Sequence, residues 1–117
     1  MKTLGEHFLI DLYGCSSDLL NDKELIESIL NQAAKVANAT VVTSNIHQFS
    51  PFGVSGVLVI SESHIAIHTW PEHKFAAIEF FRCSSKFKIE LAKKYILSKF
   101  NPGKSDEKKV NRGKLNL

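Results

Sequence analysis

The peptide bond Glu62-Ser63 lies between two apolar runs that are typical of β-strands, and it is the first place in this chain to look for chemistry. A serine held in a bend can turn its hydroxyl toward the carbonyl of the preceding residue. His68, five residues further on, offers an imidazole that exchanges protons near neutral pH. Cys83 adds a thiol. These residues predict a bond-breaking site as well as a fold.

Three other kinds of chemistry are not favoured. His64 and His68 have a spacing that suits a metal on a helix, but four strand residues span ~13 Å, too far for one ion with ~2 Å bonds to bridge. The chain has no Gly-x-Ser-x-Gly elbow of a serine hydrolase. It also lacks the glycine loops that hold dinucleotides or nucleoside triphosphates.

Several motifs of the chain resemble those of the small prokaryotic S-adenosylmethionine decarboxylase proenzymes. They are the segment 49–56 (FSPFGVSG), the segment 60–64 (ISESH), the segment 68–72 (HTWPE), Gly5, His7 and the segment 13–15 (YGC). The similarity runs from the N-terminus to about Cys83, and a motif of this length is highly specific. Composition and spacing alone yield only a serine in a bend, a nearby base and a thiol.

The resemblance implies that the precursor cuts itself. The Ser63 hydroxyl would attack the Glu62 carbonyl to give an ester, and β-elimination would turn Ser63 into a pyruvoyl group. The chain would then consist of residues 1–62 and 63–117. In such enzymes the histidine matching His68 removes the α-proton, and the hydroxyl matching Ser55 assists processing.

The resemblance also implies how the mature enzyme would work. The pyruvoyl derived from Ser63 would form a Schiff base with the substrate and serve as the electron sink, with no metal expected. The thiol matching Cys83 is the family's proton donor. Phe49 and Trp70 would stack on the adenine, and Glu72 would bind the ribose hydroxyls.

Each of these residues has a structural explanation when it is taken singly, such as a turn serine or a core aromatic. Together with the contiguous motifs they favour a pyruvoyl-dependent S-adenosylmethionine decarboxylase that makes the aminopropyl donor for spermidine. Two alternatives stay open. One is a pyruvoyl-dependent arginine or ornithine decarboxylase, against which the aromatic residues argue. The other is an unprocessed binding or regulatory subunit.

The length and composition of the chain indicate its domain organisation, its partners and its location. The 117 residues predict a single domain, 1–117, that an oligomer interface would help to stabilise, and the resemblance implies a homodimer of cleaved protomers. A net charge of +3 without an arginine-rich stripe does not favour nucleic acid. We expect no membrane span and no signal peptide, a cytoplasmic location, and reduced thiols at Cys15 and Cys83.

The first half of the chain predicts a β-α-β unit. The segments 7–13 and 41–49 have the β-branched and aromatic residues of strands. Between them, Asn21 or Asp22 can cap a helix with one apolar face. The residues expected on that face are Leu25, Ile26, Ile29, Leu30, Ala33 and Ala37.

The second half predicts an antiparallel meander followed by a helix. The strands expected are 57–60, 64–70 and 75–81, the last two separated by 71–73. A helix from about Lys86 to Asn101 is expected to turn Phe87, Leu91, Tyr95 and Ile96 toward the sheet. The basic tail 104–117 is expected to be loosely held. These elements describe an α+β two-layer sandwich with two helices on one face of a mainly antiparallel sheet.

Overall fold

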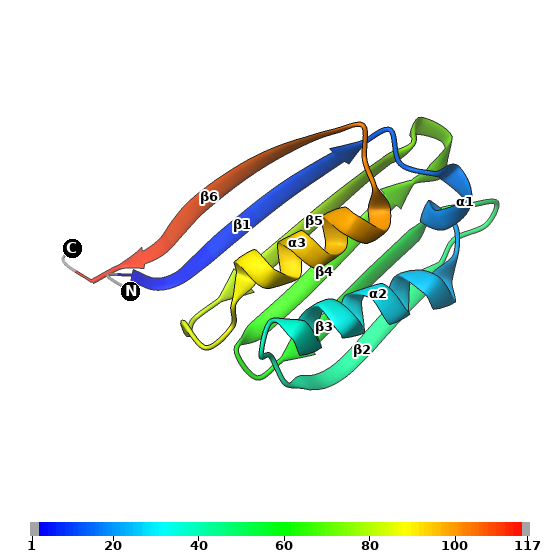
Figure 1. Ribbon diagram of the computed structural model, residues 1–117. Coiled ribbons are helices and arrows are strands. Elements are labelled where there is room, and N and C mark those ends of the chain that lie inside the picture. The colour runs from blue at the N-terminus through cyan, green and yellow to red at the C-terminus, as the bar shows by residue number, and fades with distance from the viewer. Residues whose placement is uncertain (1–2, 116–117) are drawn as a thin grey trace.

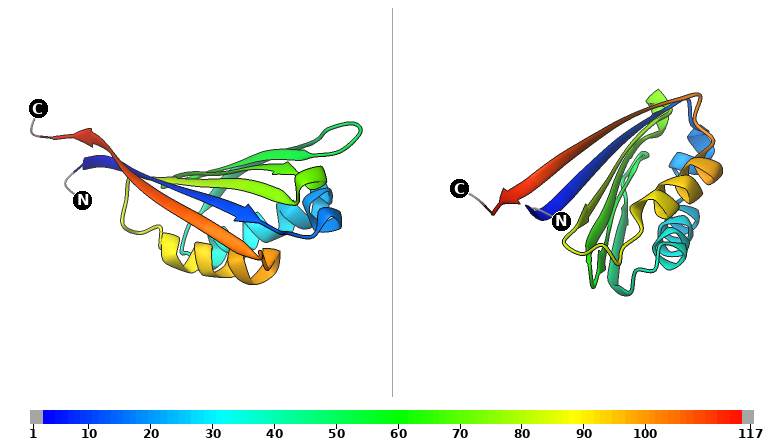
Figure 2. Two further views of the ribbon diagram at one scale, coloured as in Figure 1. Left: turned by 90° about the horizontal axis from the view of Figure 1, so that it is seen from above. Right: turned by 60° about the vertical axis from the view of Figure 1, so that its left-hand side comes forward.

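The computed structural model describes residues 3–115, in which helices cover one face of a six-stranded antiparallel sheet (Figures 1 and 2). The sheet order is β2-β3-β4-β5-β1-β6. The strands are β1 Thr3–Tyr13, β2 Val41–Gln48, β3 Val54–Ile60, β4 Ser63–Trp70, β5 Phe75–Arg82 and β6 Lys104–Lys114. The helices are α1 Ser17–Leu20, α2 Lys23–Val36 and α3 Ile89–Phe100. The predicted α+β two-layer class is confirmed, with the short α1 as an additional element.

Helix α2 begins where the sequence predicts it. The Asp22 carboxylate accepts a hydrogen bond from the Leu25 amide at 3.0 Å, which satisfies one of the free amides of the first turn. Ile26 and Leu30 are fully buried against the sheet. Leu25 was expected in the core but is 41% exposed, and Ala34 is buried instead. The apolar stripe is therefore rotated slightly from the predicted one, because Leu25 lies at its edge beside Ile26.

The middle strands form the predicted meander. β3 pairs with β4 and β4 pairs with β5, both antiparallel. The two-residue turn Ser61-Glu62 joins β3 to β4, and a 3₁₀ turn, Pro71–His73, precedes β5. The scissile bond of the sequence hypothesis therefore lies at the tip of a hairpin.

Helix α3 begins later than expected, at Ile89. Phe87 still enters the core and is fully buried, although it precedes the helix. Leu91 was expected to face the sheet and is 49% exposed, whereas Ala92 and Ile96 are buried. Asn101 ends the helix in the left-handed conformation, as the Asn-Pro-Gly sequence predicts.

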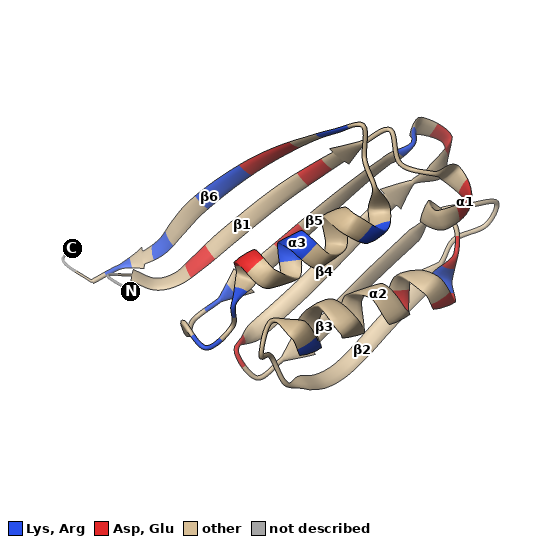
Figure 3. Ribbon diagram, in the orientation of Figure 1, with Lys and Arg blue, Asp and Glu red and all other residues tan. Residues whose placement is uncertain are grey.

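The prediction of a loosely held tail is wrong for residues 104–114. They form β6, which pairs along almost the whole of β1 at the edge of the sheet. β1 therefore lies between β5 and β6. Figure 3 shows charged residues of both signs along β6. Such charges are common on edge strands, where they oppose pairing with other chains, and they hide the strand from a search for alternating apolar residues.

Within the described part of the chain, the opposite face of the sheet carries no helix (Figure 2). Because the buried Ile65, Ile67 and Thr69 face the helices, the alternating residues of β4 project from the other side. We call this helix-free side the open face. Among residues 3–115, no helix is long and apolar enough to cross a membrane.

Candidate active site

The Glu62-Ser63 bond lies in the hairpin turn between β3 and β4. Ile60 pairs with Ser63 across this turn, so the two residues Ser61 and Glu62 reverse the chain. Ser63 has a φ of 145°, a conformation that residues with a Cβ rarely adopt. The backbone is therefore strained at Ser63, the residue proposed to attack the Glu62 carbonyl.

Two donors of Cys83 point at the carbonyl oxygen of Glu62. The Cys83 amide donates to it at 3.1 Å, and the Cys83 thiol lies 3.4 Å from it. Cys83 is exposed and directly follows β5, the strand that pairs with the start of β4. Donors in this position can stabilise negative charge that develops on a carbonyl oxygen under attack. The sequence could not predict this use of a main-chain amide that lies 21 residues from Glu62.

Ser55 and His68 form a hydrogen-bonded pair on the open face. Their strands place them opposite each other, and the Ser55 hydroxyl lies 3.0 Å from His68 Nδ1. His68 is exposed, so its ring can meet a group that approaches the sheet. This pair has the geometry of a base with a hydroxyl partner.

His68 does not reach Ser63 within this chain. Both belong to β4 and are five residues apart, which corresponds to ~17 Å along a strand. Proton transfer needs hydrogen-bond distance or one bridging water. The structure thus brings Ser63 together with Cys83, and Ser55 together with His68, but keeps the two pairs apart.

The three residues expected to bind the nucleoside lie near His68. Trp70 is the last residue of β4, and Phe49 follows β2 at the same end of the sheet. Both side chains are close to half exposed, and their strands are separated only by β3, about 10 Å across. Glu72 is exposed on the turn that follows Trp70. This end of the open face therefore has two partly exposed aromatic rings, with Phe49 beside His47 and Trp70 beside Phe75, and an exposed carboxylate.

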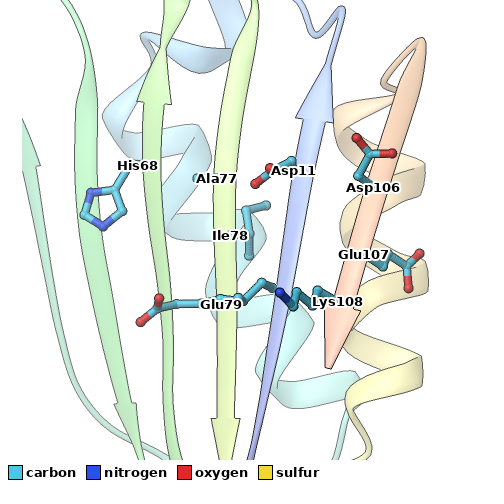
Figure 4. A pocket seen from close by; sticks show the side chains of 9 residues that line it. Asp11, His68, Ala77, Ile78, Glu79, Asp106, Glu107 and Lys108 are labelled. Atoms are coloured by element: carbon cyan, nitrogen blue, oxygen red, sulfur yellow. The ribbon is translucent and has the colours of Figure 1, made fainter. Parts of the chain in front are cut away.

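A cavity of about 400 Å³ adjoins His68 on the open face. Figure 4 shows the side chains of Asp11, Glu79 and Asp106 around it, with the Lys108 side chain extending from β6 across β1. Its volume lies in the range of small-molecule sites. With Glu107, four acidic residues and one lysine line the cavity, and this excess of negative charge favours a ligand with positive charge.

A charged cluster ties the sheet together behind the Ser63 end. Arg82, the partner of Ser63 in the β4–β5 ladder, donates from Nε to Glu6 at 2.7 Å, and Lys109 of β6 lies 2.9 Å from the other Glu6 oxygen. The hydrogen bond from Lys109 and the contacts with Arg82 hold the pKa of Glu6 below its usual value, against the opposing effect of burial. The cluster links β5, β1 and β6.

Two further groups have shifted pKa values but lie outside the site. Burial raises the pKa of the Cys15 thiol, which favours an inert structural cysteine. Hydrogen bonds to Glu90 and Glu107 raise the pKa of Lys93, which joins α3 to β6. Cys15 and Cys83 are both free, as expected.

Known proteins resemble this chain over nearly its full length. The family model of S-adenosylmethionine decarboxylase matches residues 6–113. A protein from Thermodesulfovibrio yellowstonii named S-adenosylmethionine decarboxylase proenzyme is 51% identical over 100 residues, which are 86% of this chain and 74% of that protein. One of the same name from Sulfurihydrogenibium is 45% identical over 112 residues, or 96% of this chain and 84% of that protein.

The fold is likewise similar to that of a solved structure. The crystal structure of the adenosylmethionine decarboxylase from Aquifex aeolicus superimposes with a TM-score of 0.89 at 42% identity. The match covers 97% of this chain and 93% of that one.

Proposed function

This chain belongs to the S-adenosylmethionine decarboxylase family, and we propose that it is a self-processing, pyruvoyl-dependent enzyme that decarboxylates S-adenosylmethionine. The product would be the aminopropyl donor for spermidine. The structural observation that best supports this proposal is the strained backbone of Ser63. It lies beside the Glu62 carbonyl, which already accepts a hydrogen bond from the Cys83 amide. The proposal includes a cytoplasmic location, where thiols stay reduced.

Self-cleavage starts with the Ser63 hydroxyl. Its oxygen attacks the Glu62 carbonyl carbon, the carbonyl oxygen takes negative charge, and the Cys83 amide 3.1 Å away stabilises that charge. The C–N bond then breaks, the Ser63 nitrogen takes a proton, and an ester joins Glu62 to the serine oxygen. Breaking this bond releases the backbone strain at Ser63, which favours the forward direction.

Elimination completes the processing. A base removes the Ser63 α-proton, the Cβ–O bond breaks, and the Glu62 carboxylate leaves with the bonding electrons. Water then replaces the nitrogen of the dehydrated residue, ammonia departs, and a pyruvoyl group begins the fragment 63–117. When present, this group supplies the electron sink that decarboxylation of an amino acid requires.

The base that serves Ser63 comes from a second copy of the chain. His68, with its partner Ser55, has suitable geometry but lies ~17 Å along the strand from the Ser63 of its own protomer. If two open faces pack around a two-fold axis, the Ser63 end of one copy can meet the His68 end of the other, and symmetry creates two identical sites.

The open face has the composition expected of such an interface. Besides the polar site residues, it carries apolar side chains on four neighbouring strands. These are Leu9, Val57, Val59, Ala66, Ala77 and Phe81. A sheet face left in water normally carries mainly polar residues, so this pattern supports a homodimer with the open faces inside.

Substrate binding uses the end of the open face that carries His68. Phe49 and Trp70 stack on the adenine with their exposed surfaces, and Glu72 accepts hydrogen bonds from the ribose hydroxyls. The Cys83 thiol, at the Ser63 end of the other copy, returns a proton to the substrate α-carbon after carbon dioxide has left.

Intact mass and a denaturing gel test the processing. Purified protein should contain the fragments 1–62 and 63–117, with the second blocked at its N-terminus. Ser63→Ala should remain one full-length chain, whereas Ser61→Ala in the same turn should still be cut. A wild-type chain that stays whole on long incubation would contradict the proposal and favour the unprocessed binding or regulatory subunit.

Carbon dioxide release tests the substrate. A second candidate function is a pyruvoyl-dependent arginine or ornithine decarboxylase. It is favoured by the carboxylates of Asp11, Glu79 and Asp106 beside His68, which could bind a cationic substrate. We expect release from S-adenosylmethionine and much less from arginine and ornithine, because the exposed aromatic pair suits an adenine. Release from one of the two amino acids alone would establish the second candidate.

A further inference from the structure

Two histidines and a glutamate from three strands converge on the open face. His7 of β1 and His64 of β4 both pair with Phe81 of β5, so they flank it on the same side of the sheet. Glu79 lies two residues along β5 on that side. These three residues are distant in the sequence, and pairing of the strands is what brings their side chains together.

We propose that His7, His64 and Glu79 form a binding site for a divalent transition-metal ion of the Zn²⁺ type. His64 Nε2 lies 3.2 Å from Glu79 Oε1, and His7 Nε2 lies 3.5 Å from Glu79 Oε2. One ligand atom from each residue can be chosen such that all three lie within 4.8 Å of one another. Ligands ~2.1 Å from a tetrahedral ion are about 3.4 Å apart, so the longest separation needs to close by at most about 1.4 Å.

The hydrogen bonding of the cluster leaves a ligand atom unused. His64 Nε2 has a hydrogen-bond partner in Glu79. His7 Nε2 is shielded from solvent and has no hydrogen-bond partner among residues 3–115. An unpaired buried nitrogen is costly in a purely structural network, whereas a lone pair directed at a cation removes that cost.

Phe81 holds both imidazoles in place. Its ring stacks with that of His64 at 5.8 Å and meets that of His7 edge-on at 5.4 Å. Gly5 leaves the space for the Phe81 ring, because a Cβ at that position would come within 2.5 Å of it. The ligands are therefore oriented before an ion arrives, which favours binding.

The ligand set indicates which ions would bind. Two imidazole nitrogens and one carboxylate suit Zn²⁺ and its neighbours, whereas Mg²⁺ and Ca²⁺ prefer oxygen ligands alone. Three protein ligands leave the fourth position of a tetrahedral ion for water or another small ligand. In the single protomer each of the three side chains is partly exposed, by 20% for His7, 32% for His64 and 35% for Glu79, so an ion can enter before two open faces meet in the proposed dimer.

The site would join parts of the chain that the proposed processing separates. His7 belongs to residues 1–62, and His64 and Glu79 belong to residues 63–117. This consequence rests on the proposed function, but binding of the ion does not, because the ligands are already together in the uncut chain.

Calorimetric titration with Zn²⁺ tests the site on tag-free protein stripped of metal with a chelator. We expect one ion per chain in both the wild type and the uncut Ser63→Ala variant. His7→Ala, His64→Ala and Glu79→Gln should each lower the affinity by about 100-fold or more. His73→Ala, which removes an exposed histidine elsewhere, should bind as the wild type does.

Thermal unfolding checks whether these variants are still folded. Metal-free Glu79→Gln keeps the shape of the side chain and should unfold near the wild-type temperature, but only the wild type should gain stability when Zn²⁺ is added. No binding to the wild type would overturn the proposal. Unchanged affinity in folded Glu79→Gln and His64→Ala would do the same.

Discussion

The two ends of strand β4 differ in almost every respect that matters for chemistry. At its start, Ser63 has a strained backbone, Cys83 points at the Glu62 carbonyl, and charged side chains behind the sheet bind β5 to β1. At its far end, His68 and Trp70 are exposed. Between these two comes Thr69, which is anchored in the core by a hydrogen bond to the Leu20 carbonyl at 2.7 Å.

This difference separates bond breaking from proton transfer and substrate recognition. The start of β4 has the bond proposed to be cut and a donor for its carbonyl oxygen, but its imidazole, His64, is hydrogen-bonded to Glu79. The far end has a base and aromatic surfaces, but no reactive carbonyl. In the proposed mechanism one strand therefore contains two half-sites, which a second copy of the chain would complete.

Mixing two inactive variants tests this separation most severely. Ser63→Ala and His68→Ala should each form no pyruvoyl group when expressed alone. Co-expressed in equal amounts, they should yield pyruvoyl on about a quarter of all chains, because half the dimers are mixed and each has one intact pair of half-sites. Mass analysis of chains with distinguishable tags measures this fraction.

The chains that carry pyruvoyl in the mixture should all be His68→Ala chains, since only they retain Ser63. A mixture without pyruvoyl would show that a second copy does not supply the base. Normal pyruvoyl formation by His68→Ala alone would show that His68 is not the base.

Cys83→Ala should separate the two roles of this residue. The Cys83 amide remains, so the chain should still cut itself. Turnover should be poor and should decline quickly, because the proton for the substrate α-carbon is missing. Progress curves of carbon dioxide release measure both effects, and normal, durable turnover would show that another group supplies the proton.

Trp70→Ala should weaken substrate binding at the far end of β4 and leave cleavage intact. Loss of one stacked aromatic ring costs about 1–3 kcal/mol, which corresponds to a KM increase of roughly 5- to 150-fold. Trp70→Phe should restore most of the affinity. Phe52→Ala removes an aromatic side chain that is also exposed, in the loop that contains Phe49, and serves as the control. Equal effects of Phe52→Ala and Trp70→Ala would argue against an adenine site at Trp70.

Glu6→Gln should have the smallest effect of these variants. It should lower the stability of the fold by weakening the charged cluster behind the Ser63 end. The pKa of Glu6 is lowered, so its charged contacts stabilise the fold above the ordinary glutamate pKa of about 4.3, and this contribution is lost as the pH falls through the lower folded value. The free energy of unfolding of the variant should be about 1.5–3 kcal/mol lower than that of the wild type at neutral pH. On acidification it should fall less than that of the wild type does. Urea unfolding at several pH values measures this, with the exposed Glu24→Gln as control. Parallel acid profiles of Glu6→Gln and the wild type would contradict the assignment.

The sequence predicts the central meander and the helical layer because their apolar patterns are strong. The strands from Val54 to Arg82 alternate or run apolar, and Asp22 marks the start of α2. β6 was not predicted because it has almost no apolar residues. Its strand structure depends on main-chain pairing with β1. Local pattern rules cannot detect a strand that depends mainly on a neighbour distant in sequence.

The sequence names the residues of the candidate site but not how the fold groups them. The motifs around Ser63 and His68 name the candidate side chains, yet their short separation in sequence suggests a contact that an extended strand prevents. Conversely, nothing near His7 in the sequence points to His64 or Glu79, which pairing of three strands brings beside it. Distances in a sheet follow strand register, which the sequence of a single strand does not reveal.

The position of β1 between β5 and β6 gives the proposed cut an unusual outcome. Fragment 1–62 would supply β1, and fragment 63–117 would supply the strands on both sides of it. The two pieces are thus interlaced through one hydrogen-bonded sheet, and native enzyme has no simple route to dissociation. Once denatured, however, two separate polypeptides would have to meet again, so recovery should depend on protein concentration for the mature enzyme much more than for its precursor.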